Sequence, residues 1–343
     1  MPPERPAPQK EPVSMPAPLS IIDFHSHYIP PGFDLGHLVT GSAANRAHWQ
    51  SVIGKITDPR ALVEDIDSGD LAGRVVNVPL ALIAPHPAGF PADLPARLND
   101  ALAALVAERP GQLFGLAAVD TFGGEASARE LTRAVQELGL HGVFLDSGRG
   151  DRLINAPEAR PVLEAAAGLG VPVFLHPVNP PGLTEQLAPF GRLGTLLARG
   201  TVNSAALASL IAEGVFDRLP GLQVVVTNLA IAGILLGAAY DQPEDGRSPA
   251  AKVLRRQVFA DTMGFDPVVI AALAAALGPD RVLAGSDWPI VSQGPIRPRL
   301  QAALNGAGLS PDAQSAIASG TLRKVLGLGA ADSGNDARRV RSA

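Results

Sequence analysis

The sequence predicts an α/β protein, a single (β/α)8 TIM barrel, because short apolar runs alternate with amphipathic segments along the whole chain. The apolar runs number eight, and several are continuous stretches of Val, Leu, Ile and Phe, which is typical of parallel strands buried on both faces. Eight strand–helix units fit a closed barrel better than an open sheet, and no glycine-rich dinucleotide-binding pattern follows the first run. The expected strands are Ser20–Phe24, Arg74–Pro79, Leu113–Ala118, Gly142–Leu145, Pro172–His176, Leu222–Thr227, Val258–Asp261 and Arg281–Gly285.

The segments between these runs space Leu, Val and Ala three and four residues apart, which indicates helices with one apolar stripe. Gly139, Gly170 and Pro220 stand where such helices should end. The connection after the first strand is unusually long, and we expect this loop insertion to fold over the barrel mouth. The expected helices are Leu94–Glu108, Glu125–Leu138, Pro157–Leu169 and Ser204–Arg218.

Length and composition fit one soluble domain. The chain has 343 residues, and we assign residues 20–329 to the barrel, between a proline-rich tail at 1–19 and a polar tail at 330–343 that we expect to be disordered. No run is apolar and long enough for a membrane span or a secretory signal, so a cytoplasmic location is the default expectation. A net charge of -5 gives no support for a nucleic-acid or membrane-surface partner.

Four ligand-type side chains fall at the carboxyl ends of the expected strands, where TIM barrels carry their chemistry. His25 and His27 end strand 1, His176 ends strand 5, and Asp287 follows strand 8, which closes the barrel against strand 1. Each alone has a plainer explanation: an exposed loop histidine, a core histidine bonded to a carbonyl, or a turn aspartate. Together they predict one divalent metal ion, and because the chain has no cysteine its ligands must be histidine and carboxylate. Three imidazoles and a carboxylate favour Zn²⁺, with Mn²⁺, Fe²⁺ or Co²⁺ open.

Asp23 alternates in phase with the two strand 1 histidines. In a regular strand its carboxylate would point to the same side as the imidazoles. We therefore expect Asp23 to hydrogen-bond one of them, with an ordinary aspartate at the strand entry as the alternative.

At this point the chain resembles the amidohydrolase superfamily, and more narrowly the amidohydrolase-related branch that contains aminocarboxymuconate semialdehyde decarboxylase and 6-methylsalicylate decarboxylase. The resemblance runs from about Ile21 to Leu328. It implies a barrel with one metal held by the four residues already chosen. Dinuclear relatives bridge two metals with a strand 4 lysine or glutamate, where this chain has Asp146. The motifs that carry the resemblance are Ile22-Asp23-Phe24-His25-Ser26-His27, Asn155-Ala156-Pro157-Glu158, Phe174-Leu175-His176-Pro177, Gly214-Val215-Phe216-Asp217-Arg218-Leu219-Pro220 and Ala284-Gly285-Ser286-Asp287-Trp288-Pro289.

The chain departs from this family at the end of strand 6, where the family has a histidine and this sequence has Asn228. An amide cannot carry a proton as imidazole does, although it can donate or accept hydrogen bonds. Non-oxidative decarboxylation needs less than hydrolysis, since Asp287 alone can act as the acid and base while the metal chelates the substrate.

We therefore predict a metal-dependent carboxy-lyase that acts on a small aromatic or unsaturated carboxylic acid, with Asp287 and Asn228 as the catalytic positions. A metal-dependent hydrolase of a C–N or ester bond in a small cyclic substrate is the second hypothesis. A non-catalytic barrel, disabled by the replacement at Asn228, is the third.

The loops after strands 1 and 2 should shape the substrate site. His48, Trp49 and Lys55 in the first loop and His86 in the second are the candidate substrate-binding residues, since Trp49 could stack on a ring and Lys55 could hold a carboxylate. Ordinary surface side chains are the alternative for each. The resemblance also implies a homodimer or a larger homo-oligomer.

Overall fold

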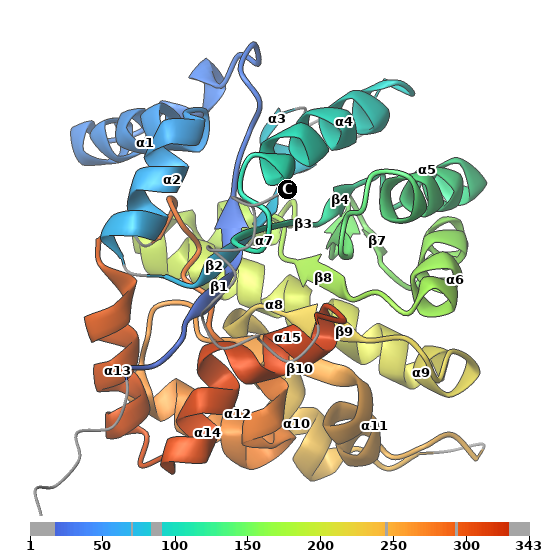
Figure 1. Cartoon of the computed structure of the whole chain (residues 1–343). Coiled ribbons are helices and arrows are strands. Elements are labelled where there is room, and N and C mark those ends of the chain that lie inside the picture. Colours follow the sequence, from blue (N-terminus) through green and yellow to red (C-terminus); the bar gives the residue numbers. More distant parts are fainter. Residues whose placement is uncertain (1–17, 70, 84–90, 244–245, 292–293, 329–343) are drawn as a thin grey trace, which may run out of the picture.

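The computed structural model describes residues 18–69, 71–83, 91–243, 246–291 and 294–328. Short parallel strands lie at the centre of the molecule and helices surround them (Figure 1). The strands of the barrel are β1 (Ile22–His27), β2 (Gly73–Asn77), β3 (Leu113–Gly115), β4 (Ala117–Ala118), β5 (Val143–Asp146), β8 (Val173–His176), β9 (Val224–Val226), β10 (Val258–Asp261) and β11 (Val282–Leu283).

Backbone hydrogen bonds join the strands in two runs, β1-β2-β3 and β11-β10-β9-β8-β5-β4. Further backbone hydrogen bonds connect the two runs at both seams. Leu116 lies between β3 and β4 and donates its N–H to the carbonyl of Val76 at 2.9 Å, so the two short strands form one barrel strand. At the other seam, the N–H of Phe24 donates to the carbonyl of Ala284 at 2.8 Å, which brings the first strand against the last. The predicted TIM barrel is confirmed.

Each of the eight expected apolar runs contains a strand, and six strands lie within two residues of the expected bounds, whereas the first and third differ more. The first strand extends to His27 rather than ending at Phe24, so both histidines lie within it. The third is interrupted at Leu116, where the chain changes its bonding partner from β2 to the β5 side.

The interior of the barrel is filled by large apolar side chains, including Phe24, Phe144, Phe174 and Phe259. Leu322 of α15 (Thr321–Val325) packs against the same group from one end of the barrel. Because this interior is packed, a substrate of the barrel would bind beyond the strand ends.

Three of the four expected helices lie within a few residues of their predicted bounds: α4 (Leu94–Ala107), α5 (Gly124–Gln136), and α6 (Arg160–Leu169) after a turn of 3₁₀ helix at Pro157–Ala159. The fourth expected segment, Ser204–Arg218, is mostly helical, but its predicted start and its continuity were wrong. That region forms α8 (Gly191–Ala212) and α9 (Val215–Arg218).

The helix α8 begins earlier than expected and contains two glycines, each of which permits a close backbone contact. A Cβ at Gly200 would lie 2.9 Å from the carbonyl oxygen of Leu229, and one at Gly194 would overlap the backbone of Leu187. The break before α9 falls at Gly214, whose φ of +63° suits glycine.

The insertion after β1 is largely helical. It contains a 3₁₀ turn at Gly36–Leu38, α1 (Ala43–Ile56) and α2 (Pro59–Ser68). Val52 and Ile56 of α1 are buried in a small apolar cluster that includes Ile290, so the insertion packs against the loop that follows β11.

The remaining helices complete the outer layer, and no helix among the described residues is long and apolar enough to cross a membrane. Most of the predicted tails at 1–19 and 330–343 lies outside the described residues, although Leu19 packs against the main core. The other helices are α3 (Leu80–Ile83), α7 (Leu183–Leu187), α10 (Ile231–Tyr240), α11 (Ala250–Gln257), α12 (Pro267–Leu277), α13 (Ile296–Gly306) and α14 (Pro311–Ser315).

Candidate metal centre at the barrel mouth

The three histidines predicted from the sequence lie together at the carboxyl ends of β1 and β8. One ring nitrogen from each of His25, His27 and His176 lies within 4.8 Å of the others, and all three side chains are buried. Among the described residues, this is the one cluster of histidine and acidic side chains close enough to hold a metal ion.

A β-bulge in β1 brings both strand 1 histidines to the inner side. The pairing of β1 with β2 shifts register between Asp23 and Ser26, so the strict alternation of side chains is broken there. The rings of Phe24 and His25 consequently both lie 4.9 Å from the ring of Phe174.

The same bulge separates Asp23 from the imidazoles. Its carboxylate accepts hydrogen bonds from the hydroxyl of Ser286 at 2.6 Å and from Nε of the buried Arg74 at 3.2 Å. The expected hydrogen bond to an imidazole is not among its contacts in the described part of the chain, so the prediction for Asp23 was wrong.

Each strand 1 histidine is held through Nδ1 by a polar residue at the end of another strand. His27 Nδ1 lies 2.6 Å from Oδ1 of Asn77, whose Nδ2 donates to the carbonyl of Ser26. This second bond orients the amide, so Asn77 Oδ1 is an acceptor and Nδ1 of His27 carries the proton. His25 Nδ1 lies 2.5 Å from Oδ2 of Asp261. With Nδ1 engaged in this way, both histidines direct Nε2 into the site, where it is the nitrogen available to a metal ion.

Those Nε2 atoms are buried and lack a hydrogen-bond partner within the described residues, as does Oδ1 of Asp287. Asp287 Oδ1 lies 3.0 Å from Nε2 of His27 and 3.5 Å from Nε2 of His25. Ligand atoms about 2.1 Å from a tetrahedrally coordinated ion lie roughly 3.4 Å from one another. Buried acceptors at this spacing fit a divalent cation, since without one they face each other unsatisfied.

The backbone of Asp287 is itself unusual. Its φ of +57° lies in the left-handed region, which non-glycine residues seldom occupy. Such strain is tolerated where surrounding structure enforces it, commonly at functional sites.

The ionisation states in the cluster suit metal ligands. Burial, reinforced by the charge of Arg199, holds the pKa of His176 well below its usual range, so this imidazole is neutral. Burial alone would raise the pKa of Asp287, but His25, His27 and Arg199 lower it below the ordinary value. Burial opposes the protonation of His25, yet Asp287 and Asp261 raise its pKa. The carboxylates of Asp287 and Asp261 thus favour a positive charge beside His25.

Arg199 on α8 is a site residue that the sequence analysis missed. Asn203, one turn further along the helix, donates hydrogen bonds to the carbonyl of Leu175 at 3.1 Å and the hydroxyl of Thr227 at 3.4 Å, next to His176 and Asn228. Residues four apart share a helix face, so Arg199 also lies on the barrel side. In the sequence, the signal for a role of Arg199 was its position four residues before Asn203, on the same face of a helix with few charged residues.

The guanidinium of Arg199 retains donors for a ligand. Its one hydrogen bond within the described residues runs from Nη1 to Oδ1 of Asn179 at 3.3 Å, although the group has five N–H donors. Burial lowers the pKa of Arg199, against the charges of Asp287 and Asp146. Arg199 therefore places a cation at the mouth of the barrel.

Asp146 at the end of β5 pairs in register with His176, and burial raises the pKa of Asp146 to about 6. It does not join the three-histidine cluster among the described residues, which fits a single metal rather than two.

Asn228, the predicted catalytic position on strand 6, is fixed by two hydrogen bonds. Its backbone N–H donates to Asp261 Oδ1 at 2.9 Å, and its Nδ2 donates to the carbonyl of Met263 at 2.6 Å. Its Oδ1 is buried without a partner in the described residues. Asn228 thus offers the site a hydrogen-bond acceptor.

The predicted substrate-binding residues are less well placed. Trp49 packs in the small cluster that contains Ile290, three residues after Asp287, and the ring of His48 lies 5.8 Å from the ring of Trp49. Lys55 is half-buried in the last turn of α1. His86 lies outside the described residues. The substrate-binding roles of all four stay predictions.

A family model described as amidohydrolase matches residues 22–328. The chain belongs to the amidohydrolase family. This confirms the resemblance predicted for about Ile21 to Leu328, and the match covers all the strands of the barrel and the four candidate ligands.

Two curated amidohydrolase relatives are decarboxylases. The gamma-resorcylate decarboxylase of Rhodococcus jostii is 31% identical over 219 residues, which cover 57% of this chain and 66% of that protein. The 2-amino-3-carboxymuconate-6-semialdehyde decarboxylase of Dictyostelium discoideum is 29% identical over 210 residues, which cover 57% of this chain and 56% of that protein. The chain thus spans less than two thirds of the length of either relative.

A solved structure shares the fold of this amidohydrolase. It is a dihydroxybenzoic acid decarboxylase from Polaromonas sp. JS666 with bound manganese and the inhibitor 2-nitroresorcinol. It has a TM-score of 0.74 at 20% identity and covers 91% of this chain and 98% of that chain.

We predict that Asp261→Asn weakens Mn²⁺ binding about 10–100-fold, because the neutral amide orients His25 less firmly and makes its Nε2 a poorer donor. Isothermal titration of the metal-free protein with Mn²⁺ measures the change. Asp266→Asn is the control, since Asp266 caps α12 and asparagine caps equally well. An Asp261→Asn variant that binds Mn²⁺ as tightly as the control would contradict the assignment of this site.

Proposed function

We propose that this amidohydrolase is a metal-dependent non-oxidative decarboxylase of small hydroxylated aromatic carboxylic acids. The observation that carries the proposal is the buried cluster of His25, His27 and His176 with the unsatisfied carboxylate oxygen of Asp287 beside it. The similarity of this chain to gamma-resorcylate decarboxylase supports the reaction type and the substrate class.

One divalent ion would be held by His25, His27, His176 and Asp287. We predicted zinc from the ligand types, and the manganese in the Polaromonas enzyme makes Mn²⁺ the first ion to test. When bound, the ion would hold the substrate by coordination, and its positive charge would stabilise the negative charge that develops during the reaction.

The residues of the chain account for the proton that the reaction consumes. The bond between the ring carbon and its carboxylate breaks, the electron pair stays on the ring carbon, carbon dioxide leaves, and one proton is added to that carbon. Asp287 is the proposed acid and base: it is ionised, so it first takes a proton from the substrate or from water and then delivers that proton to the ring carbon, with one oxygen facing the histidines and the other free for the transfer. Asp261 cannot replace it, since its carboxylate already accepts hydrogen bonds from His25, Asn228 and Met263.

Arg199 and Asn228 are proposed to position the substrate. Arg199 would attract the anionic acid to the mouth of the barrel and hold it through its remaining N–H donors. Asn228 would accept a hydrogen bond from a ring hydroxyl through Oδ1, which has no partner in the described part of the chain. A hydroxylated aromatic acid offers both groups.

We expect the Mn²⁺-loaded protein to release carbon dioxide from gamma-resorcylate or a related dihydroxybenzoate, and a chelator to abolish the release until Mn²⁺ is restored. Carbon dioxide and the ring product are measured together across a panel of hydroxybenzoates. Ammonia or acid release from amide and ester substrates, without carbon dioxide from the panel, would establish the hydrolase instead. No turnover of any substrate would leave a non-catalytic barrel.

We expect Asn228→His to lower kcat/KM at least about 10-fold, because an imidazole cannot keep the bond to Met263 and also present the acceptor where Asn228 Oδ1 lies. Steady-state kinetics on the substrate found in the panel measure the change. A rise in activity would instead show that Asn228 disables an ancestral histidine site.

We expect Arg199→Leu to raise KM about 10–100-fold with a smaller change in kcat, the cost of losing charge-assisted hydrogen bonds to an anionic substrate. Arg129→Leu on the exposed face of α5 is the matched control for the loss of one positive charge. Equal KM values for the two variants would exclude Arg199 from substrate binding.

A further inference from the structure

Asp146 is a buried acidic residue at the barrel mouth that lies outside the metal cluster and has no part in the proposed reaction. It ends β5 and pairs in register with His176 at the end of β8. Phe144 and Phe174, the matched pair two positions earlier, both lie in the barrel interior. Side chains two apart along a strand share a side, so Asp146 points to the same side as His176, one strand away from it.

The carboxyl group of Asp146 lacks the partner that a buried polar group needs. The residue is only 7% exposed, and its backbone N–H donates to the hydroxyl of Thr121 at 2.9 Å. The carboxyl itself makes no hydrogen bond or ion pair with the residues that the structure describes. Buried polar groups are rarely left in this state, which indicates a ligand as the missing partner.

Two arginines act on Asp146 through their charge, but each has a partner of its own. Arg149 forms an ion pair with Asp120 whose atoms lie 2.6 Å apart, and Arg199 donates to Asn179. Burial raises the pKa of Asp146 to about 6, because the two positive charges only partly offset the loss of water and the charge of Asp120. The carboxyl therefore remains available to a molecule bound in the mouth.

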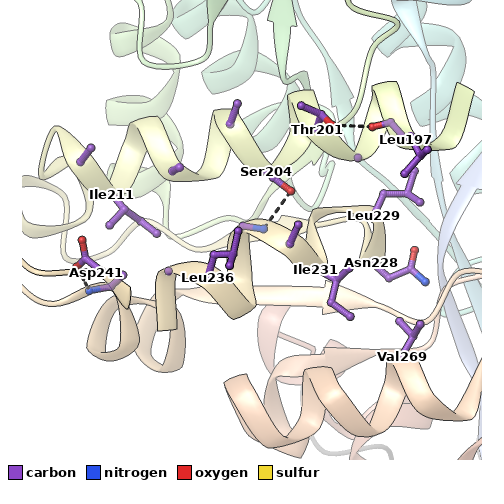
Figure 2. A pocket seen from close by; sticks show the side chains of 18 of the residues that line it. Leu197, Thr201, Ser204, Ile211, Asn228, Leu229, Ile231, Leu236, Asp241 and Val269 are labelled. Atoms are coloured by element: carbon purple, nitrogen blue, oxygen red, sulfur yellow. Dashed lines mark hydrogen bonds between the residues drawn. The ribbon is translucent and has the colours of Figure 1, made fainter. Parts of the chain in front are cut away.

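The place of Asp146 complements that of Asn228 on the other side of His176. Asp146 ends β5 and Asn228 follows β9, the two strands that flank β8. Asn228 lines one end of a groove of about 730 Å³ between α8 and α10, together with the apolar Leu229 and Val269 (Figure 2). The site thus has an amide on one side of His176 and a carboxyl on the other, and each can hold one hydroxyl group.

An aromatic ring with two hydroxyls matches this arrangement. In the proposed function, Asn228 accepts a hydrogen bond from one ring hydroxyl. A second hydroxyl can donate to Asp146 as a carboxylate or accept from it as a neutral carboxyl, so the contact forms in either protonation state. A ring without this hydroxyl would leave the carboxyl buried and unpaired, which costs affinity.

We propose that Asp146 is a specificity-determining residue, whose carboxyl hydrogen-bonds a second hydroxyl on the substrate ring and so selects dihydroxylated over monohydroxylated aromatic acids. The identity of the substrate rests on the proposed function. The contact itself can be tested with ring compounds that are not decarboxylated.

Binding of two such compounds to the Mn²⁺-loaded protein tests the proposal by isothermal titration. 2-Nitroresorcinol, the inhibitor bound to the Polaromonas enzyme, has a hydroxyl on each side of its nitro group, and 2-nitrophenol lacks one of them. We expect the wild type to bind 2-nitroresorcinol about 10-fold more tightly than 2-nitrophenol. Asp146→Leu should bring this ratio close to one, whereas Asp146→Asn should keep most of it, because an amide also hydrogen-bonds a hydroxyl.

Asp151→Leu is the matched control and should keep the wild-type ratio. Asp151 is exposed in the turn between β6 (Gly148–Arg149) and β7 (Arg152–Leu153), so the substitution removes the same charge from the same connection without touching the mouth. Because the ratio compares two ligands on one protein, a variant that is only partly folded still gives a valid value.

A wild type that does not distinguish the two compounds, or that binds neither, would overturn the proposal. Equal weakening of both compounds in Asp146→Leu would also overturn it, since that is the effect of merely balancing the charge of Arg199. So would a ratio in Asp146→Asn as low as in Asp146→Leu. A retained preference for 2-nitroresorcinol without carbon dioxide release from the hydroxybenzoate panel would refute the proposed function alone.

Discussion

The carboxylate of Asp261 is the contact on which the candidate site depends. Through Oδ2 it orients His25, and through Oδ1 it binds the backbone N–H groups of Asn228 and Met263. One buried side chain thus ties the first strand of the barrel to the turns after β9 and β10. Gly285 is part of the same constraint, because a Cβ there would lie 2.8 Å from the Cβ of Asp261 and 3.0 Å from that of His25. The segment after β11 can approach Asp261 and His25 this closely only because Gly285 has no side chain.

Much of the fold was predictable because continuous apolar runs respond to burial on both faces, which a closed parallel barrel requires of every strand. The three histidines were predictable for a related reason, since polar side chains at the ends of buried strands need a partner. Asn77 and Asp261 follow the same rule at the ends of β2 and β10, yet neither is a distinctive residue by itself. Their role depends on which imidazole lies opposite, which only the three-dimensional structure gives.

Other features could not be derived from sequence periodicity. The bulge in β1 changes which side Asp23 faces, and no pattern in the sequence marks where strict alternation fails. Arg199 and His176 are 23 positions apart in the sequence, and it is the bonds of Asn203 to two strand ends that bring α8 to the mouth. Gly194 and Gly200 lie inside α8, and the sequence alone does not distinguish a glycine at a helix end from one at a close backbone contact.

The packed interior of the barrel has a consequence for how molecules enter and leave. Phe24, Phe144 and Phe174 fill the space beneath the histidines, and α15 seals the far end. Among the described residues, apolar side chains therefore fill the barrel between the histidines and α15. In the proposed reaction both products must depart along the path by which the acid arrived. Both must therefore leave before the next acid molecule can bind.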